Sequence, residues 1–177
     1  MINNFLLWAT RKMPARAIDL DGEHYIERYH VVSVGKLEVV LHRYLGCDGD
    51  REVHDHPNRW CLGIPLVGGY TEERVTGFCP IKGWHSRYVK IRPWRWNFVS
   101  AMRWHRIDSV QPGTWTLFVR WDRFKSWSFA HKRRWSYGDP ALSEVVISQP
   151  LSLASAANWQ KGAQKGAGFR RARGTGR

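Results

Sequence analysis

Two histidines separated by one residue, His54 and His56 in the run Val-His-Asp-His-Pro, have a spacing suited to metal binding. Side chains alternate between the two faces of an extended strand, so both imidazoles point to one side and Asp55 to the other. Inside a barrel without a metal, each would be a poorly satisfied polar group at a cost of ~1–3 kcal/mol. The pair therefore predicts two metal ligands, although solvated strands also carry this motif.

A third histidine, His105, begins a strand-like run that is followed by Pro112-Gly113 and a second apolar run. A histidine in that position can reach the first pair across a barrel. Three neutral imidazoles leave open positions on a divalent ion, which favours Fe(II) binding both O2 and substrate and also suits Zn, Ni or Mn. Because such a site leaves the charge of the ion uncompensated, it favours a small anionic substrate.

The elements that must position these histidines are short runs rich in Val, Ile, Tyr, Trp and Phe, separated by Gly, Pro, Asp and Asn. The predicted strands are Tyr25–Ser33, Lys36–Leu45, Glu52–His56, Cys61–Val67, Tyr70–Thr76, Arg87–Ile91, Asn97–Ser100, His105–Val110, Thr114–Trp121 and Trp127–His131. This pattern predicts an all-β sandwich or barrel. Residues 2–13 predict one short N-terminal helix that ends before Pro14, and Pro65 predicts an edge strand or a bulge.

The chain of 177 residues is long enough for one domain, which we place at residues 1–150, and its 11 Trp exclude disorder throughout. The formal net charge of +13 is concentrated toward the end. Residues 151–177 contain no acid and the cations Lys161, Lys165, Arg170, Arg171, Arg173 and Arg177. We expect a flexible basic tail, which is either a solubilising terminus or an arm that contacts nucleic acid.

Composition also limits the class of protein. No apolar run has the ~18–20 residues that span a bilayer, and the N-terminus does not resemble a signal peptide. The Cys count is odd and lacks C-x-x-C spacing, which disfavours a disulfide scaffold and a zinc finger. We therefore expect a soluble cytoplasmic protein with no membrane partner. The sequence also lacks a Walker loop and a G-x-S-x-G elbow, which disfavours the common NTPase and hydrolase classes.

Tryptophans interleaved with Arg and Lys have two interpretations. The residues are Trp84, Trp94, Trp96, Trp104 and Trp115. Such patterns occur on surfaces that stack bases or sugars. Small barrels also fill their interiors with alternating aromatic residues, so packing in the core or at the rim is the alternative.

Four segments together resemble the cupin superfamily, in particular small cupins encoded by phages and bacteria. They are His54-Asp55-His56-Pro57, Gly68-Gly69-Tyr70, His105-Arg106 and Trp115-Thr116-Leu117. The resemblance implies a double-stranded β-helix, or jelly-roll barrel, with a metal held by His54, His56 and His105, and pairing into a homodimer. Cupins usually add a Glu ligand after the second His, but Trp60 and Cys61 occupy those positions here.

A Cys at that position is similar to thiol dioxygenases related to cysteine dioxygenase. That resemblance implies iron, a role for Cys61 beside it, and Arg28 as the group that binds the substrate carboxylate. The alternative for Cys61 is a small buried hydrophobic residue. Glu72 and Glu73 follow the Gly-Gly turn and face opposite sides of a strand, so at most one reaches the interior. We take Glu73 as the candidate ligand or general base.

The favoured function is a metal-dependent cupin enzyme, an Fe(II) oxygenase or dioxygenase, acting on a small anionic substrate. A metal-assisted isomerase or lyase would use the same site. Two non-enzymatic alternatives stay open, namely a cupin that binds a small molecule or carbohydrate and a nucleic-acid-binding protein that uses its basic tail.

Overall fold

The computed structural model describes residues 1–177 except 21–22, 47–51, 80–82, 135–142, 149–159 and 162–177. One short helix, α1 (Ile2–Ala9), continues into a 3-10 turn at Thr10–Lys12 and gives way to strands before Pro14, as the sequence predicts. The strands are β1 Pro14–Leu20, β2 Glu23–Val34, β3 Leu37–Tyr44, β4 Val53–His54, β5 Asn58–Val67, β6 Tyr70–Cys79, β7 Gly83–Ile91, β8 Asn97–Ser100, β9 His105–Val110, β10 Trp115–Arg123, β11 Phe129–Arg134, β12 Ser143–Ser148 and β13 Gln160–Lys161.

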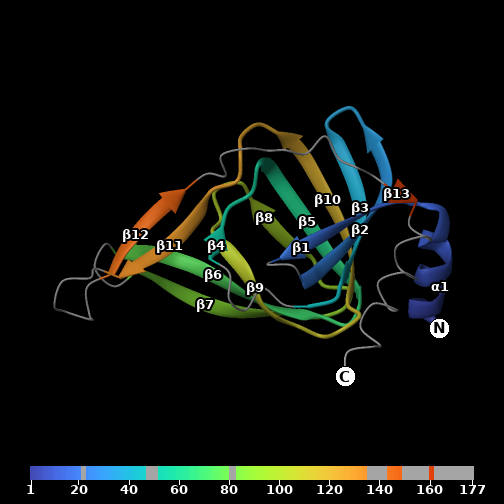
Figure 1. Cartoon of the computed structure of the whole chain (residues 1–177), viewed down its shortest axis with the longest axis horizontal. Helices are drawn as coiled ribbons and strands as arrows, with labels where there is room; N and C mark the ends of the chain where they lie inside the picture. The colour runs from blue at the N-terminus through green and yellow to red at the C-terminus, as the bar shows by residue number, and fades with distance from the viewer. Residues whose placement is uncertain (21–22, 47–51, 80–82, 135–142, 149–159, 162–177) are drawn as a thin grey trace, which may run out of the picture.

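Two antiparallel sheets form the body of the protein (Figure 1). The larger sheet contains the strand order β3-β10-β5-β8, and the smaller contains β4-β9-β6-β7. Between β3 and β10 along the chain, every connection between consecutive strands crosses from one sheet to the other, except the β6–β7 hairpin. Eight strands in two four-stranded sheets with these crossings form a jelly roll. The predicted all-β jelly-roll fold is therefore confirmed by the strand order.

Additional strands extend both sheets. β1 and β2 lengthen the larger sheet beside β3, and β11 and β12 lengthen the smaller one beside β4. The sequence patterns predicted neither β1 nor β12. Of the expected basic tail, only β13 lies within the described residues, where it pairs with Pro14 and Ala15 of β1.

Helix α1 packs on the outer face of the larger sheet. Leu6 joins Tyr29, Leu41 and Trp115 in a buried cluster, and the ring of Trp115 stacks on Tyr29 with centroids 5.5 Å apart. The indole of Trp115 also donates a hydrogen bond to Asn3 on the helix. Because the other face of this sheet borders the interior, consecutive residues of β3 are buried and the strand does not show a simple alternation.

A tight glycine turn sets the start of β6. Gly68 has φ +72, and a Cβ on it would lie 2.3 Å from Oγ1 of Thr114, so no larger residue fits there. Pro65, just before this turn, lies in β5 beyond the residues that pair with β8, so β10 is its strand neighbour and the position is a local edge. A register shift between β10 and β5 next to Pro65 also shows a bulge.

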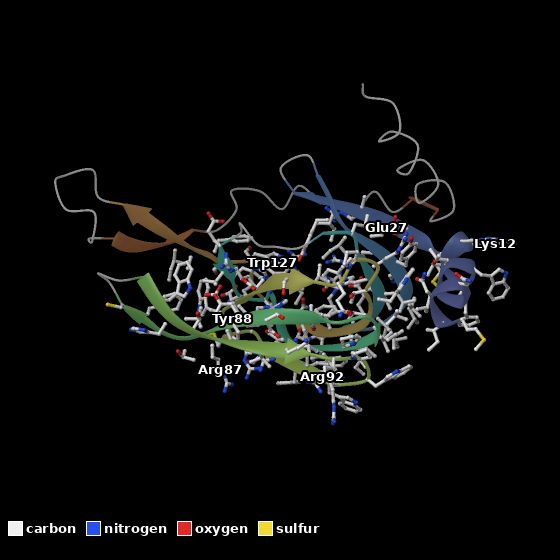
Figure 2. The ribbon with its side chains drawn as sticks, turned by 90° about the horizontal axis from the view of Figure 1, so that it is seen from below. Lys12, Glu27, Arg87, Tyr88, Arg92 and Trp127 are labelled. Atoms are coloured by element: carbon white, nitrogen blue, oxygen red, sulfur yellow. The ribbon has the colours of Figure 1, made fainter. Side chains whose placement is uncertain are left out.

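The smaller sheet turns its other face to the outside. Arg87 and Tyr88 of β7, and Arg92 just after it, are exposed, and Figure 2 shows Arg87 and Arg92 at the rim of the protein. Helix α1 and the 3-10 turn are too short to cross a bilayer, and no helix in the described ranges is a candidate membrane span.

Candidate metal centre

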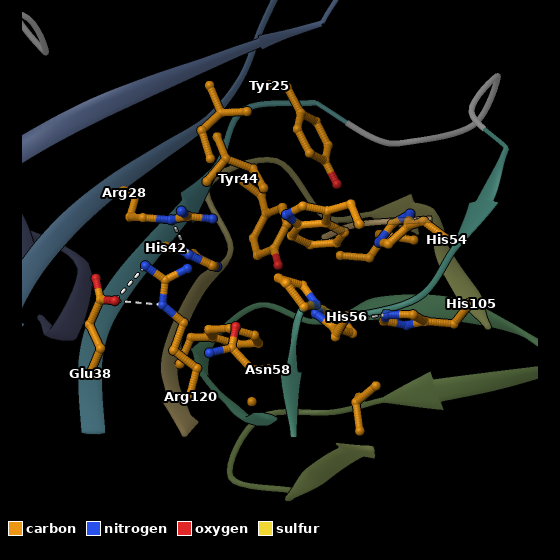
Figure 3. Close-up of a pocket in the computed structure, with 18 of the residues that line it drawn as sticks. Tyr25, Arg28, Glu38, His42, Tyr44, His54, His56, Asn58, His105 and Arg120 are labelled. Carbon is orange, nitrogen blue, oxygen red and sulfur yellow. Dashed lines mark hydrogen bonds and ion pairs between the residues drawn. The ribbon is translucent and has the colours of Figure 1, made fainter. Parts of the chain in front are cut away.

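The structure brings together the three predicted histidine ligands (Figure 3). His54 on β4 is directly opposite His105 on β9, and His56 follows two residues after His54, before β5 begins. One ring nitrogen of each imidazole lies within 4.8 Å of the other two. Side-chain alternation therefore places both members of the pair on the inner face, as predicted.

The nearest approach is between Nε2 of His56 and Nε2 of His105, which are 2.6 Å apart. On its other side, Nδ1 of His105 lies 2.5 Å from Oε1 of Glu72. Burial raises the pKa of Glu72, but hydrogen bonds from His105 and Arg74 outweigh it and lower the pKa to about 2. An ionised carboxylate only accepts hydrogen bonds, so Nδ1 of His105 carries the proton and Nε2 presents its lone pair.

The surroundings favour a neutral His56. Burial, followed by the neighbouring His105 and His54, holds the pKa of His56 well below its usual value. The centroid of the Trp127 ring lies 5.1 Å from that of the His56 ring and 5.2 Å from that of the His54 ring. Neutral imidazole is the form that binds a metal ion, so the His56 side chain is ready to act as a ligand near neutral pH.

This donor set fits a divalent transition metal. Imidazole nitrogens suit Fe, Ni, Cu and Zn, and a His that donates its second ring N–H to a carboxylate is the usual arrangement of a metal ligand. Within the described ranges, the cluster consists of the three histidines alone. Glu72 is not part of this cluster. It lies behind the His105 ring, so its charge acts on the site through that ring.

The histidines line a cavity of about 620 Å³ between the two sheets. Arg16, Arg28, Arg120 and Arg123 also line it, and Arg28 and Arg120 lie near His42 and Glu38 (Figure 3). Arg120 donates to Glu38 at 2.7 Å, whereas Arg28 donates from Nε to Nε2 of His42 at 3.0 Å. The charge of Arg120 is therefore matched by a carboxylate, and Arg28 is bonded to a neutral ring.

The protonation states of this second group follow from burial. Burial and then Arg28 keep the pKa of His42 well below its usual value, so the ring is neutral. Burial and then Arg120 lower the pKa of Arg28 to about 10, which still leaves it protonated at neutral pH. The cavity thus contains imidazole ligands and, separately, an arginine whose positive charge is available to an anion.

Two other predicted site residues lie elsewhere. Glu73 accepts hydrogen bonds from Trp84, Ser86 and Arg106 and does not line the cavity. Cys61 is fully buried beneath the cavity wall and is not among its lining residues. Burial raises the pKa of the Cys61 thiol to about 12, so it is a neutral thiol at neutral pH.

Several cavity residues could not be identified from the sequence patterns. Alternation separates Glu72 from Glu73 but does not say which one faces inward. Arg120 shares a face of β10 with Phe118, and both line the cavity. The pairing of β10 with β3 places Thr116 opposite His42, whose side chain faces the cavity. Phe118 and Arg120 share the face of Thr116, so the pairing would have shown that they face the cavity as well.

Comparisons with known proteins found only remote similarities, all with solved structures. No family profile and no curated protein sequence matches the chain. Among solved structures, HppE in its Fe(II) form with an alternative substrate is 13% identical, with a TM-score of 0.49 over 64% of this chain and 57% of that one. The DMSP lyase DddQ from Ruegeria pomeroyi is 12% identical, with a TM-score of 0.45 over 62% of this chain and 56% of that one.

A variant of oxalate decarboxylase from Bacillus subtilis is 15% identical, with a TM-score of 0.47 over 76% of this chain and 31% of that one. The chain thus spans little more than half the length of the first solved structures it matches. These similarities are too low to identify the fold. The strand order shows it, and it is the jelly-roll fold that cupins have.

Proposed function

We propose that this protein is a metal-dependent enzyme that acts on a small anionic substrate, with Fe(II) as the favoured metal and oxidation by O2 as the favoured reaction. The observation that carries the proposal is the convergence of three imidazoles on the wall of a cavity that also contains Arg28. A cavity of about 620 Å³ is within the ~300–1,000 Å³ typical of small-molecule sites.

A bound divalent ion would supply a Lewis acid with open positions for substrate and O2. His54, His56 and His105 would hold it, and Glu72 would fix the orientation of the His105 ring through Nδ1. Arg28 would bind an anionic group of the substrate. Trp127, with the rings of Phe118 and Phe129, would limit the access of water to the histidines.

The first test is the metal content of the purified protein, measured by mass spectrometry. We expect close to one transition-metal ion per chain, and loss of that metal in His54→Ala and His105→Ala. His85→Ala is the matched control, because His85 is an exposed histidine on the outer side of β7. Metal that persists in both ligand variants would rule out the proposed site.

The second test concerns the reaction. Protein loaded with Fe(II) under anaerobic conditions is mixed with a panel of small carboxylates, thiols and phosphonates, and O2 consumption is recorded. O2 uptake that depends on both substrate and His105 supports an oxygenase. Substrate conversion without O2 would instead support the isomerase or lyase alternative with the same metal.

A further inference from the structure

A second functional surface lies outside the cavity. No Asp or Glu occurs between Arg74 and Ile107, a stretch that contains the cations Arg74, Lys82, Arg87, Lys90, Arg92, Arg95, Arg103 and Arg106. The same stretch contributes four of the tryptophans. This segment builds β7 and β8, which are the edge strands of the smaller and the larger sheet.

Among the described residues of this segment, four cations are exposed, whereas Arg74 and Arg106 are paired with Glu72 and Glu73. Arg87 and Lys90 on β7, together with Arg92 and Arg95 on the connection to β8, are exposed. Figure 2 shows Arg87 and Arg92 at the same rim of the protein. The edge region therefore has a strong positive potential that no acid within the segment offsets.

Next to these cations is a row of aromatic side chains on three neighbouring strands, which we call the aromatic ladder. It consists of Phe98 on β8, Trp60 on β5 and Trp121 on β10. The Trp60 ring is 6.3 Å from Phe98 and 6.3 Å from Trp121, with interplanar angles of 28° and 8°. Val99 and Arg120 line the cavity, so their neighbours Phe98 and Trp121 point the opposite way, to the outer face.

Further apolar side chains continue the ladder around β8. Trp96 and Met102 are 75% and 76% exposed, and Phe98 is 53% exposed. Trp94, 62% exposed, has φ +64, which is unusual for a bulky residue, and its backbone N–H donates to the carbonyl of Pro65 at 2.7 Å. That hydrogen bond ties the turn to β5 and fixes the backbone from which the indole projects.

Basic residues also border the ladder itself. Arg103 donates to the backbone carbonyl of Phe98 at 2.8 Å, which holds its guanidinium at the β8 backbone. On the other side, the guanidinium of Arg59 lies 5.1 Å from the centroid of Phe124 and bonds Asp122. Flat rings on rigid strands, flanked by guanidinium groups, present both features that single-stranded nucleic acid requires, namely faces for bases and cations for phosphates.

We propose that the aromatic ladder, Trp94, Trp96 and the surrounding arginines bind single-stranded nucleic acid. Charge complementarity favours this occupant over a second copy of the chain, which would bring one cationic surface against another. A duplex would satisfy the cations but would hide its base faces inside the stack. The site is separate from the metal centre, because its side chains lie on the outer face and the histidines on the inner one.

The test measures binding of the full chain to fluorescent oligothymidylate of about 20 nucleotides, followed by anisotropy at several salt concentrations. We expect Trp96→Ala and Phe98→Ala each to weaken binding by about fivefold or more. We expect Arg95→Ala to reduce the slope of log affinity against log salt by about 0.7, the value for one phosphate contact on a single strand.

Matched controls come from the segment around α1, outside the aromatic ladder. Trp8→Ala and Arg11→Ala change an exposed tryptophan and an exposed arginine beside α1, and every variant retains the basic tail. These controls should bind like the parent protein, and the parent should prefer the single strand over a duplex of the same length. Near-ultraviolet circular dichroism and metal content confirm that each variant is folded.

Three results would overturn the proposal. They are the absence of binding at low salt, equal affinity for duplex and single strand, and equal weakening in the control variants. Two further assays identify a different occupant. Loss of a dimer in Trp96→Ala, measured by light scattering, would assign the surface to a second copy, and vesicle binding lost in that variant with DNA binding unchanged would assign it to anionic lipid.

Discussion

Glu72 on β6 accepts a hydrogen bond from Nδ1 of His105 on β9, with 2.5 Å between the two atoms. The carboxylate is fully buried and also receives hydrogen bonds from Arg74 and from Asn97. A buried charge with three donors has one orientation and one protonation state. The relationship therefore fixes both the tautomer and the direction of the His105 ring, and it suggests the first prediction.

Glu72→Gln should weaken metal affinity by about 10- to 100-fold, the usual effect of removing a carboxylate behind a histidine ligand. The amide of glutamine has no negative charge, so it no longer favours the Nδ1–H tautomer of His105 as the carboxylate does. The measurement is metal affinity by competition with a chelator of known strength. Glu73→Gln is the matched control, because Glu73 bonds Ser86 and Arg106 away from the cavity.

Equal metal affinity in Glu72→Gln and the parent protein would contradict this role. The same pair of variants tests the prediction that Glu73 acts as a general base. Loss of turnover in Glu73→Gln with metal content unchanged would support that role, and unchanged turnover would exclude it.

His42 should make the stability of the metal-free protein depend on pH. Its pKa in the folded protein is depressed, first by burial and then by Arg28, whereas the unfolded chain has the ordinary value near 6.5. Its contribution is fully present above pH 6.5. Below that value the unfolded chain binds the proton first, so the contribution is lost as pH falls toward the folded pKa.

His42→Gln should flatten this dependence, because glutamine offers an acceptor to Arg28 but does not titrate. The change in slope is at most about 1.4 kcal/mol per pH unit for one proton. Urea unfolding in the presence of a chelator, at about pH 7.5 and about pH 5, measures it. His56 titrates in both proteins, so its contribution cancels in the difference between them. Parallel pH profiles would show that folding does not lower the pKa of His42.

Cys61 should behave as a packing residue. Burial raises the pKa of its thiol to about 12, and the thiolate is the form that reacts. Mass spectrometry after iodoacetamide treatment near pH 8 should find Cys61 unmodified in the native protein and modified in urea. Cys61→Ala should retain metal and turnover, and a loss of turnover with metal retained would instead support the thiol dioxygenase resemblance.

The sequence predicted the jelly roll and the histidine cluster for a physical reason. Strand alternation is local, so His54 and His56 share a face wherever the strand lies, and turn residues such as Gly68 mark the strand ends. The helix over residues 2–13 follows equally well from Pro14. These features depend on residues that are neighbours in the sequence, so contacts with distant segments do not alter them.

Features that depend on register were harder to predict. The inward direction of Glu72 rather than Glu73 is set by pairing of β6 with β9, which single-strand patterns do not encode. β1 was missed because an irregularity between Ile18 and Asp19 interrupts the alternation of Pro14–Leu20. Pro65 is tolerated in β5 because β8 pairs only with Trp60 to Gly63, which leaves Pro65 with β10 as its strand neighbour.

The last prediction separates two of the cavity arginines. Arg28 and Arg120 both line the cavity, but Arg120 is paired with Glu38, whereas Arg28 donates to the neutral ring of His42. Glu38 also acts on Arg28 at longer range, but its hydrogen bond is to Arg120, so an incoming anion meets a less compensated charge at Arg28. A hydrogen bond to a charged group is worth about 1.5–3 kcal/mol, so Arg28→Gln should weaken anion binding by about 10- to 150-fold. Calorimetric titration of the metal-loaded protein with succinate and with phosphonoacetate measures this, and Arg87→Gln, on the exposed side of β7, controls for general loss of positive charge. Equal affinities in Arg28→Gln and Arg87→Gln would show that the metal alone attracts the anion.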